Sequence, residues 1–229
     1  LLTATLFLRE TIPPEKRRPV RAGALNIAQP ILRLVTTPVI NRVALAFASF
    51  NLAFAAFTSL LVLALKDLFR WTPAQTSGIF VVVGITLTVV QVVLIGRLVG
   101  QWGEYRVNRY GMGLVAAGIL LIPLAQSFGP LAATLIVLSS MLLAVGAAFV
   151  LPTARSLVSG LVPPTEQGIT LGSLASLTGM ASAIGPIAAG WIYDQSTLAC
   201  FLFEATFCLL GIVLLGRSPK RVVSGVVVP

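Results

Sequence analysis

Long apolar stretches separated by short polar or basic segments set the pattern of this chain. An α-helix of about 20 apolar residues crosses a hydrocarbon layer of about 30 Å, whereas a strand of a membrane barrel needs only about 10 residues. Only helices and closed barrels satisfy their backbone hydrogen bonds in lipid. The pattern therefore predicts six membrane-spanning helices, at Val43–Leu65, Ala74–Ile95, Gly111–Gln126, Leu131–Leu151, Ile169–Tyr193 and Thr197–Gly216.

The composition agrees with a membrane protein. Hydrophobic residues make up 57% of the 229 residues and charged residues only 10%, whereas a soluble domain carries about 25% charged residues. Six spans of about 20 residues and their short loops use up most of the chain. We therefore expect an all-α membrane protein built as a six-helix transmembrane bundle, without a separate soluble domain.

The basic residues are distributed unevenly between the two sides of the predicted bundle. The net charge is +9, and one side carries 14 of the 16 Lys and Arg residues, whereas the other carries only Lys66 and Arg70. Basic residues concentrate in the cytoplasmic loops of membrane proteins. This asymmetry predicts a multi-pass protein of the cell inner (plasma) membrane with a cytoplasmic C-terminus, and it explains the positive charge without nucleic acid as a partner.

Both ends of the chain are expected on the cytoplasmic side. Residues Leu1–Leu8 are apolar but too few to span a membrane, and we interpret them as the end of a truncated transmembrane helix. Residues 9–38 begin charged and proline-rich and predict a cytoplasmic linker with an amphipathic surface helix. Residues 39–217 then form the six-helix bundle, and residues 218–229 form a cytoplasmic tail.

The sequence lacks residues on which many enzymes and metal sites depend. It contains no histidine, which excludes histidine-based catalytic triads and HExxH zinc sites. Its two cysteines, Cys200 and Cys208, lie in the last span, about 12 Å apart along one helix. That separation is too great for a disulfide. We therefore expect no enzyme activity, no metal site and no cofactor.

Small residues recur along one face of the fifth span. They are spaced alternately four and three residues apart, which places them in a single stripe down a helix. Such a stripe lets another helix approach closely. It indicates either simple helix packing or a helix that slides or tilts against its partner. The stripe consists of Gly172, Ser176, Gly179, Ala183, Pro186 and Gly190.

A glycine-containing segment joins the second and third spans on the basic side. It runs from Gly96 to Arg106 with the sequence GRLVGQWGEYR. Gly96, Leu98 and Gly103 match the loop signature G-x-L-x-D-R-x-G-R-R-x of the major facilitator superfamily, although Gly-Gln replaces its Asp-Arg pair. The segment resembles the second copy of that signature, between the eighth and ninth of twelve helices. Its glycines permit a tight reversal of the chain.

Further segments are similar to drug:proton antiporters of the tetracycline-efflux type. Val162–Gly168, Gly172–Thr178 and Ala183–Pro186 resemble the region from their tenth to their eleventh helix, and RETIPPEKR at residues 9–17 resembles their central cytoplasmic loop. The resemblance implies that the chain is the C-terminal half of a twelve-helix fold, helices seven to twelve with the end of helix six. In that fold two six-helix bundles expose a midplane cavity alternately to the two sides. A missing N-terminal half is then an expected partner.

The same resemblance implies that the first and fourth helices of this half, Val43–Leu65 and Leu131–Leu151, line the cavity. Asn51 and Thr58 are seven residues apart and share a helix face with aromatic neighbours, which suits an amphiphilic substrate. Two other roles stay open: Asn51 could hydrogen-bond another helix, and Ser139 could bond to its own helix backbone. The candidate cavity residues are Asn51, Phe54, Thr58, Ser139 and Gly146.

Two charged residues are candidates for coupling and gating. Glu204 lies about 10 Å from the start of its span, where a partly desolvated carboxyl group holds a proton more readily. It could therefore carry a coupling proton, or it could reach the external headgroups. Arg155 follows the fourth span and could be a gate residue or an ordinary cytoplasmic arginine.

These observations predict a secondary active transporter that works by alternating access. The first interpretation is proton-coupled efflux of small amphiphilic compounds or drugs, with the proton as coupling ion. A sugar, organic-acid or other metabolite permease of the same superfamily is the alternative. A truncated membrane protein without transport activity is an alternative of another class. The expected partners are the lipid bilayer, a small-molecule substrate and the missing half.

Overall fold

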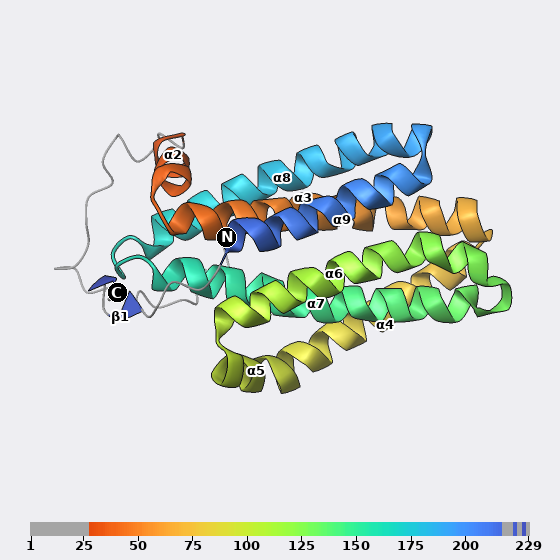
Figure 1. The fold of residues 1–229 in the computed structure, drawn as a ribbon, viewed down its shortest axis with the longest axis horizontal. Coiled ribbons are helices and arrows are strands. Elements are labelled where there is room, and N and C mark those ends of the chain that lie inside the picture. The colour runs from red at the N-terminus through yellow and green to blue at the C-terminus, as the bar shows by residue number, and fades with distance from the viewer. Residues whose placement is uncertain (1–27, 217–221, 224–225, 228–229) are drawn as a thin grey trace, which may run out of the picture.

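The structure, a computed structural model, describes residues 28–216, 222–223 and 226–227 (Figure 1). A π-helical turn, η3 (Val90–Leu94), joins α4 to α5, and a 3₁₀-helical turn, η4 (Gln126–Leu131), joins α6 to α7. The helix predicted at Leu1–Leu8 and residues 9–27 of the predicted linker lie outside the described residues. The helices are α2 (Ala28–Thr36), α3 (Ile40–Phe69), α4 (Pro73–Val89), α5 (Ile95–Trp102), α6 (Glu104–Ala125), α7 (Ala132–Gly160), α8 (Gln167–Gln195) and α9 (Thr197–Leu215).

The predicted six spans are confirmed. The described residues contain five helical segments long and apolar enough to cross a membrane, and one of them, Glu104–Gly160, comprises both α6 and α7. At the junction, Gly129 has φ 47° and ψ −113°, which breaks the helix. α6 and α7 therefore run side by side in opposite directions (Figure 1). The α4–η3–α5 rod supplies the second span, so the bundle has six spans.

The two ends of the bundle carry different loops. α2, the α5–α6 junction and the α7–α8 loop lie at one end, which we name the α2 end (Figure 1). The α3–α4, α6–α7 and α8–α9 turns lie at the opposite end, which we name the turn end (Figure 1). Arg106 and Arg155 are therefore at the α2 end, and Lys66 and Arg70 are at the turn end. This is the alternation of loops on which the predicted charge asymmetry rests.

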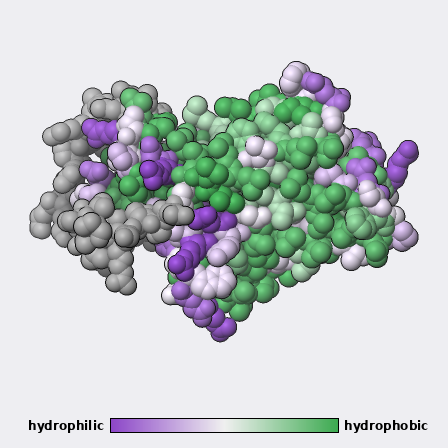
Figure 2. All heavy atoms as spheres, in the orientation of Figure 1, coloured by the Kyte–Doolittle hydropathy of each residue, from purple (hydrophilic) through white to green (hydrophobic). Residues whose placement is uncertain are grey.

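α3 runs through the middle of the bundle. It packs on α8 and α9, whereas α6 packs on α7 and α9, and α4 packs mainly on α7. Phe50, Phe57 and Met112 are among the fully buried core residues. Apolar side chains also cover the outside, since Ile187 and Val213 are 76% and 74% exposed. Figure 2 shows hydrophobic residues across the middle of the visible face and hydrophilic residues towards its ends, a surface typical of contact with lipid.

Glycines let neighbouring helices approach closely. A Cβ atom at Gly146 of α7 would overlap the Gly111 carbonyl of α6, and a Cβ atom at Gly185 of α8 would overlap the Leu52 carbonyl of α3. In lipid such close backbone contacts replace the hydrophobic driving force that packs helices in water. At the α6–α7 and α3–α8 interfaces the rotation of the helices is therefore set by the glycines that meet the neighbouring backbone.

Short elements flank the bundle. The predicted amphipathic helix is α2, which packs on α8 and α3. Its Leu34 is buried, whereas Leu32 is 63% exposed. Within the predicted C-terminal tail, β1 (Val222–Val223) and β2 (Val226–Val227) pair in antiparallel fashion. The remaining tail residues lie outside the described part of the chain.

The segment that resembles the superfamily loop signature is mostly helical. α5 contains Gly96 and Leu98, and the helix ends at Gly103, where φ is 78° and ψ is 156°. Glycine alone adopts this conformation readily. Leu98 packs against a small cluster that includes Val107, whereas Arg106 is exposed. The predicted reversal therefore depends on Gly103, and Gly96 lies within a helix.

Replacing Gly103 with alanine is expected to destabilise the protein by about 1–3 kcal/mol, because a Cβ atom is strained at this φ. Gly100→Ala is the matched control. It lies within α5, where a Cβ atom would meet nothing within 4 Å and alanine favours the helix. Thermal unfolding in detergent compares the two variants. A Gly103→Ala variant as stable as the wild type would contradict this turn geometry.

Candidate functional site

A cavity of about 370 Å³ lies between α3, α7 and α8. A volume of a few hundred Å³ and a wall that combines apolar residues with a few polar groups are typical of small-molecule sites. α3 and α7 each contribute one residue to this wall, and α8 contributes the rest. The lining residues are Phe47, Arg155, Leu171, Leu174, Ala175, Thr178, Gly179 and Ser182.

Three polar residues lie in this wall. Arg155 supplies a permanent positive charge with five N–H donors. Thr178 and Ser182 lie one turn apart on α8, so they share a helix face. The Thr178 hydroxyl donates to the Leu174 carbonyl of its own helix at 2.9 Å, and its oxygen can still accept a hydrogen bond. The arrangement suits an organic molecule with an apolar body and an anionic or hydrogen-bonding group.

The predicted α3 face is linked to the cavity through Phe47. Asn51, Phe54 and Thr58 are half-buried, and Phe47 precedes Asn51 by one turn on the same face. The Asn51 amide donates to the Phe47 carbonyl at 2.8 Å. Thr58 likewise donates to the Phe54 carbonyl at 2.9 Å. The amide nitrogen of Asn51 thus bonds within α3 and not to another helix, and a contact of this face with substrate stays a prediction.

Ser139 and Gly146 lie in the α6–α7 interface, away from the cavity. The Ser139 hydroxyl is fully buried and donates to the Gly118 carbonyl of α6 at 2.6 Å, so it bonds across the interface and not to its own helix. Arg155 lies roughly 160° around α7 from Ser139. Because Ser139 and Gly146 both face α6, they are corrected from cavity residues to packing residues, and Arg155 is the cavity residue of α7.

The small-residue stripe of α8 does not pack on the other described helices. Cβ atoms at Gly172, Gly179 and Gly190 would meet nothing within 4 Å, and Ala183 is exposed. α8 approaches α3 through Gly185 instead, which is outside the stripe. The described helices therefore do not use the stripe for close packing, and its packing or sliding role against another helix stays a prediction. Gly179 lines the cavity, so the stripe borders the candidate site.

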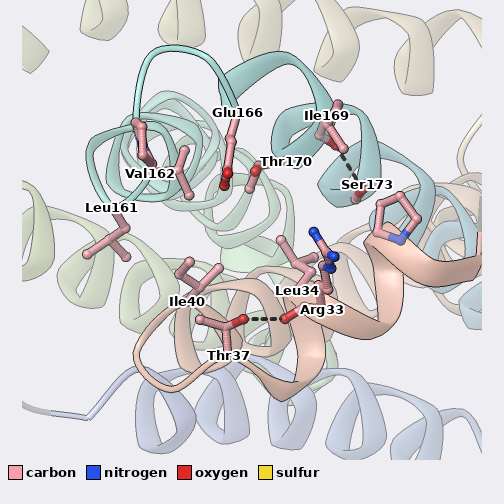
Figure 3. Close-up of a pocket in the computed structure, with 12 residues that line it drawn as sticks. Arg33, Leu34, Thr37, Ile40, Leu161, Val162, Glu166, Ile169, Thr170 and Ser173 are labelled. Carbon is pink, nitrogen blue, oxygen red and sulfur yellow. Dashed lines mark hydrogen bonds between the residues drawn. The ribbon is translucent and has the colours of Figure 1, made fainter. Parts of the chain in front are cut away.

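A second cavity of about 430 Å³ lies at the α2 end, between α2, the start of α3 and the α7–α8 loop (Figure 3). Arg33 and Glu166 point into it from opposite sides (Figure 3). The Thr37 hydroxyl donates to the Arg33 carbonyl at 2.6 Å, and the Ser173 hydroxyl donates within α8. Its charged groups have opposite signs and favour neither an anion nor a cation. The α3–α7–α8 cavity is therefore the better candidate site.

Glu204 lies in neither of these cavities. It is fully buried, at 0% exposure, in α9, which packs on α3, α6 and α8. Its Oε1 is 3.7 Å from the Cys200 thiol, and its Oε2 has no hydrogen-bond partner among the described residues. This burial excludes the alternative that Glu204 reaches the external headgroups.

Thr178 and Ser182 were not among the residues predicted for the site. Their signal in the sequence is a Thr and a Ser four residues apart in an apolar span, on either side of Gly179. That signal is ambiguous, because hydroxyl groups in membrane helices often bond to their own backbone. Only the position of α8 against α3 and α7 shows that these two residues line a cavity.

The family model described as Major Facilitator Superfamily matches residues 110–226, which are just over half of the chain. This chain belongs to the major facilitator superfamily. The match begins within α6, at residue 110, and extends past α9, so it includes Arg155 and α8 of the candidate site. The major facilitator resemblance of the α8 segments is thereby confirmed, whereas the glycine loop, at residues 96–106, lies before the matched residues.

Relatives within the major facilitator superfamily cover most of the chain. It is 27% identical to human major facilitator superfamily domain-containing protein 10 over 95% of the chain and 50% of that protein. It is 26% identical to the class C tetracycline resistance protein of Escherichia coli over 83% of the chain and 46% of that protein. The chain spans about half the length of the curated relatives it matches.

A solved structure of a major facilitator transporter has the same fold as this chain. The crystal structure of the human organic anion transporter MFSD10 (TETRAN) matches with a TM-score of 0.78 and 25% identity, over 93% of this chain and 53% of that one. The bundle is thus half of a major facilitator fold, in a multi-pass integral membrane protein. The relatives and the fold are those of transporters and not of enzymes, as the sequence predicts.

Proposed function

We propose that the chain forms half of a secondary transporter for small amphiphilic organic compounds, organic anions among them. The observation that carries this proposal is Arg155 at the wall of a cavity of about 370 Å³ that is lined by both apolar and polar residues. An arginine forms strong, charge-assisted hydrogen bonds to carboxylates, and an apolar wall holds the rest of such a molecule. The likeness to an organic anion transporter supports this substrate class.

The transport mechanism in this proposal is alternating access. Two six-helix bundles rock against each other around a site near the membrane midplane. The described bundle contributes α3, α7 and α8 to that site, and a second six-helix half contributes the opposite wall. We place the α2 end in the cytoplasm, because basic loop residues collect there, and the protein in the plasma membrane.

We propose proton-coupled efflux as the direction of transport. The relationship to tetracycline resistance proteins supports an exporter of drug-like compounds. An organic-acid permease of the same superfamily is the second candidate, since Arg155 would serve a metabolite carboxylate equally well. The two candidates differ in the relative direction of proton and substrate.

Transport into everted membrane vesicles by the complete protein that carries this chain tests the proposal. Three fluorescent amphiphiles of equal size are compared: an anion, a neutral analogue and a cation. With an acidic vesicle lumen, the anion is expected to accumulate fastest and to release protons from the lumen. Proton movement in the same direction as substrate would indicate the permease. Preference for the cation, or no transport of any of the three compounds, would contradict the proposal.

A further inference from the structure

We infer that Glu204 is the proton-binding site of this transporter and that protons reach it from the turn end through Asp67, Tyr193 and Cys200. The inference rests on the proposed function and assigns the coupling ion a site apart from the substrate cavity. It starts from a carboxyl group that is buried without a full set of hydrogen-bond partners.

The surroundings of Glu204 suit a neutral carboxyl group. The residue is fully buried, and its Oε2 has no hydrogen-bond partner among the described residues. A charged carboxylate inside a membrane bundle needs a cation or several donors to replace its lost hydration, and the contact at Oε1 is a weakly donating thiol at 3.7 Å. Binding a proton is the change that makes this group neutral.

A metal cation does not fit the same place. Sodium, magnesium and calcium ions require several oxygen ligands around them. The groups next to Glu204 on α9 are the thiols of Cys200 and Cys208, each one helical turn away and each buried. A single carboxylate between two thiols offers too few oxygens for these ions, whereas a proton requires only one.

Polar groups lead from Glu204 to the turn end across three helices. The Cys200 thiol lies 3.7 Å from Glu204 Oε1 and 3.5 Å from the Ala189 carbonyl of α8. One turn further along α8, the Tyr193 hydroxyl donates to Asp67 Oδ2 at 3.2 Å. Asp67 is exposed near the end of α3. The Asp67–Tyr193 pair and the group formed by Ala189, Cys200 and Glu204 are thus one turn of α8 apart, and the path that we infer crosses this turn from the external surface to the buried carboxyl group.

Other charged residues of the packed helices lie away from Glu204. On α6 they lie in the first two turns, at the α2 end, whereas α9 begins at the turn end. On α3, Lys66 and Arg70 are exposed at the turn end, and Arg42 is exposed at the α2 end. On α8, Asp194 is exposed next to Tyr193. The groups left to exchange a proton with Glu204 are the buried Cys208 thiol, one turn further from the turn end, and the groups of the proposed path.

The path is closed towards the α2 end. Two turns beyond Glu204, a Cβ atom at Gly211 would lie 3.0 Å from both the Ala46 carbonyl of α3 and the Met112 sulfur of α6. Release of the proton on that side therefore requires α9 to move against α3. Phe201 of α9 also packs on Phe57 of α3, with ring centroids 6.4 Å apart. α3 also lines the substrate cavity, so relative movement of α9 and α3 couples the proton site to the substrate site. Glu204 therefore acts on substrate transport through α3.

The first test measures transport against pH in proteoliposomes with the complete protein. Glu204→Gln is expected to abolish substrate-driven proton movement and to flatten the pH profile, because glutamine cannot bind the proton. Exchange of labelled for unlabelled substrate, which needs no net proton movement, should persist. Glu204→Asp should restore pH dependence. A Glu204→Gln variant with an unchanged pH profile would overturn the inference, as would equal losses of exchange and of transport.

The second test follows the proton without substrate. An infrared band of a protonated carboxyl group should change with pH in the purified protein and be absent from Glu204→Gln. Tyr193→Phe and Asp67→Asn should slow proton uptake, whereas Tyr110→Phe and Asp194→Asn, which alter exposed residues outside the path, should not. A band that is retained in Glu204→Gln, or equal rates in all four path and control variants, would overturn the inference. If the band titrates at Glu204 but no compound is transported, the proton site stands and the proposed function fails.

Discussion

Replacing Gly146 with valine is expected to give the largest loss of stability in this bundle. A Cβ atom at this position would overlap the Gly111 carbonyl and Val115 of the neighbouring helix α6. The clash falls on backbone atoms, which cannot rotate away as a side chain can. Overpacking of a well-packed core lowers the free energy of unfolding by about 1–3 kcal/mol and occasionally more. Because valine adds two methyl groups beyond the Cβ atom, the loss for this variant is expected at the upper end of that range.

Gly84→Val is the matched control for Gly146→Val. Gly84 also lies inside a spanning helix, but a Cβ atom there would meet nothing within 4 Å. Thermal unfolding in detergent is measured for both variants together with the yield of monodisperse protein. Similar melting temperatures for the two variants would show that α6 and α7 do not pack through this glycine contact.

Replacing Arg155 with glutamine is expected to have the largest effect on substrate binding. The variant keeps a polar side chain at the α3–α7–α8 cavity but loses the positive charge. A hydrogen bond to a charged group contributes about 1.5–3 kcal/mol, so the apparent affinity for an organic anion should fall by about ten- to one-hundredfold. The affinity for a neutral analogue of the same size should change little, because the apolar wall remains.

Competition binding with the anion and its neutral analogue measures the effect of Arg155→Gln. Arg109→Gln is the control, because Arg109 is an exposed arginine near the same end of the bundle and outside both cavities. Arg155→Lys should recover only part of the affinity, since lysine keeps the charge without the forked donor geometry. Equal losses for anion and neutral analogue would assign Arg155 a structural role.

The spans and their order were predictable because the bilayer imposes a simple requirement. Each segment must satisfy its own backbone hydrogen bonds and remain apolar for about 20 residues. Val43–Leu65 and Thr197–Gly216 meet that requirement on their own, and α3 and α9 form there. The break at Gly103 was foreseeable for a similarly local reason, since glycine tolerates a backbone conformation that other residues avoid.

The direction in which each residue points was much less predictable. Ser139 and Arg155 lie on the same helix, but Ser139 bonds to α6 and Arg155 lines the cavity. The stripe of α8 is the more regular pattern, yet Gly185 outside it makes the close contact with α3. In a span that is apolar all around, hydropathy does not show which side meets protein and which meets lipid.

The sequence by itself determined the number of spans, their approximate ends, the alternation of basic loops and membership of a transporter superfamily. These properties follow from the thickness of the membrane, the asymmetric placement of charge and short local motifs. Only the tertiary structure decided that Thr178 and Ser182 lie beside Arg155 at one cavity, and that Glu204 is buried next to Cys200. Helix rotation is set by close contacts between small residues of different helices, and such contacts join positions that are far apart in the chain.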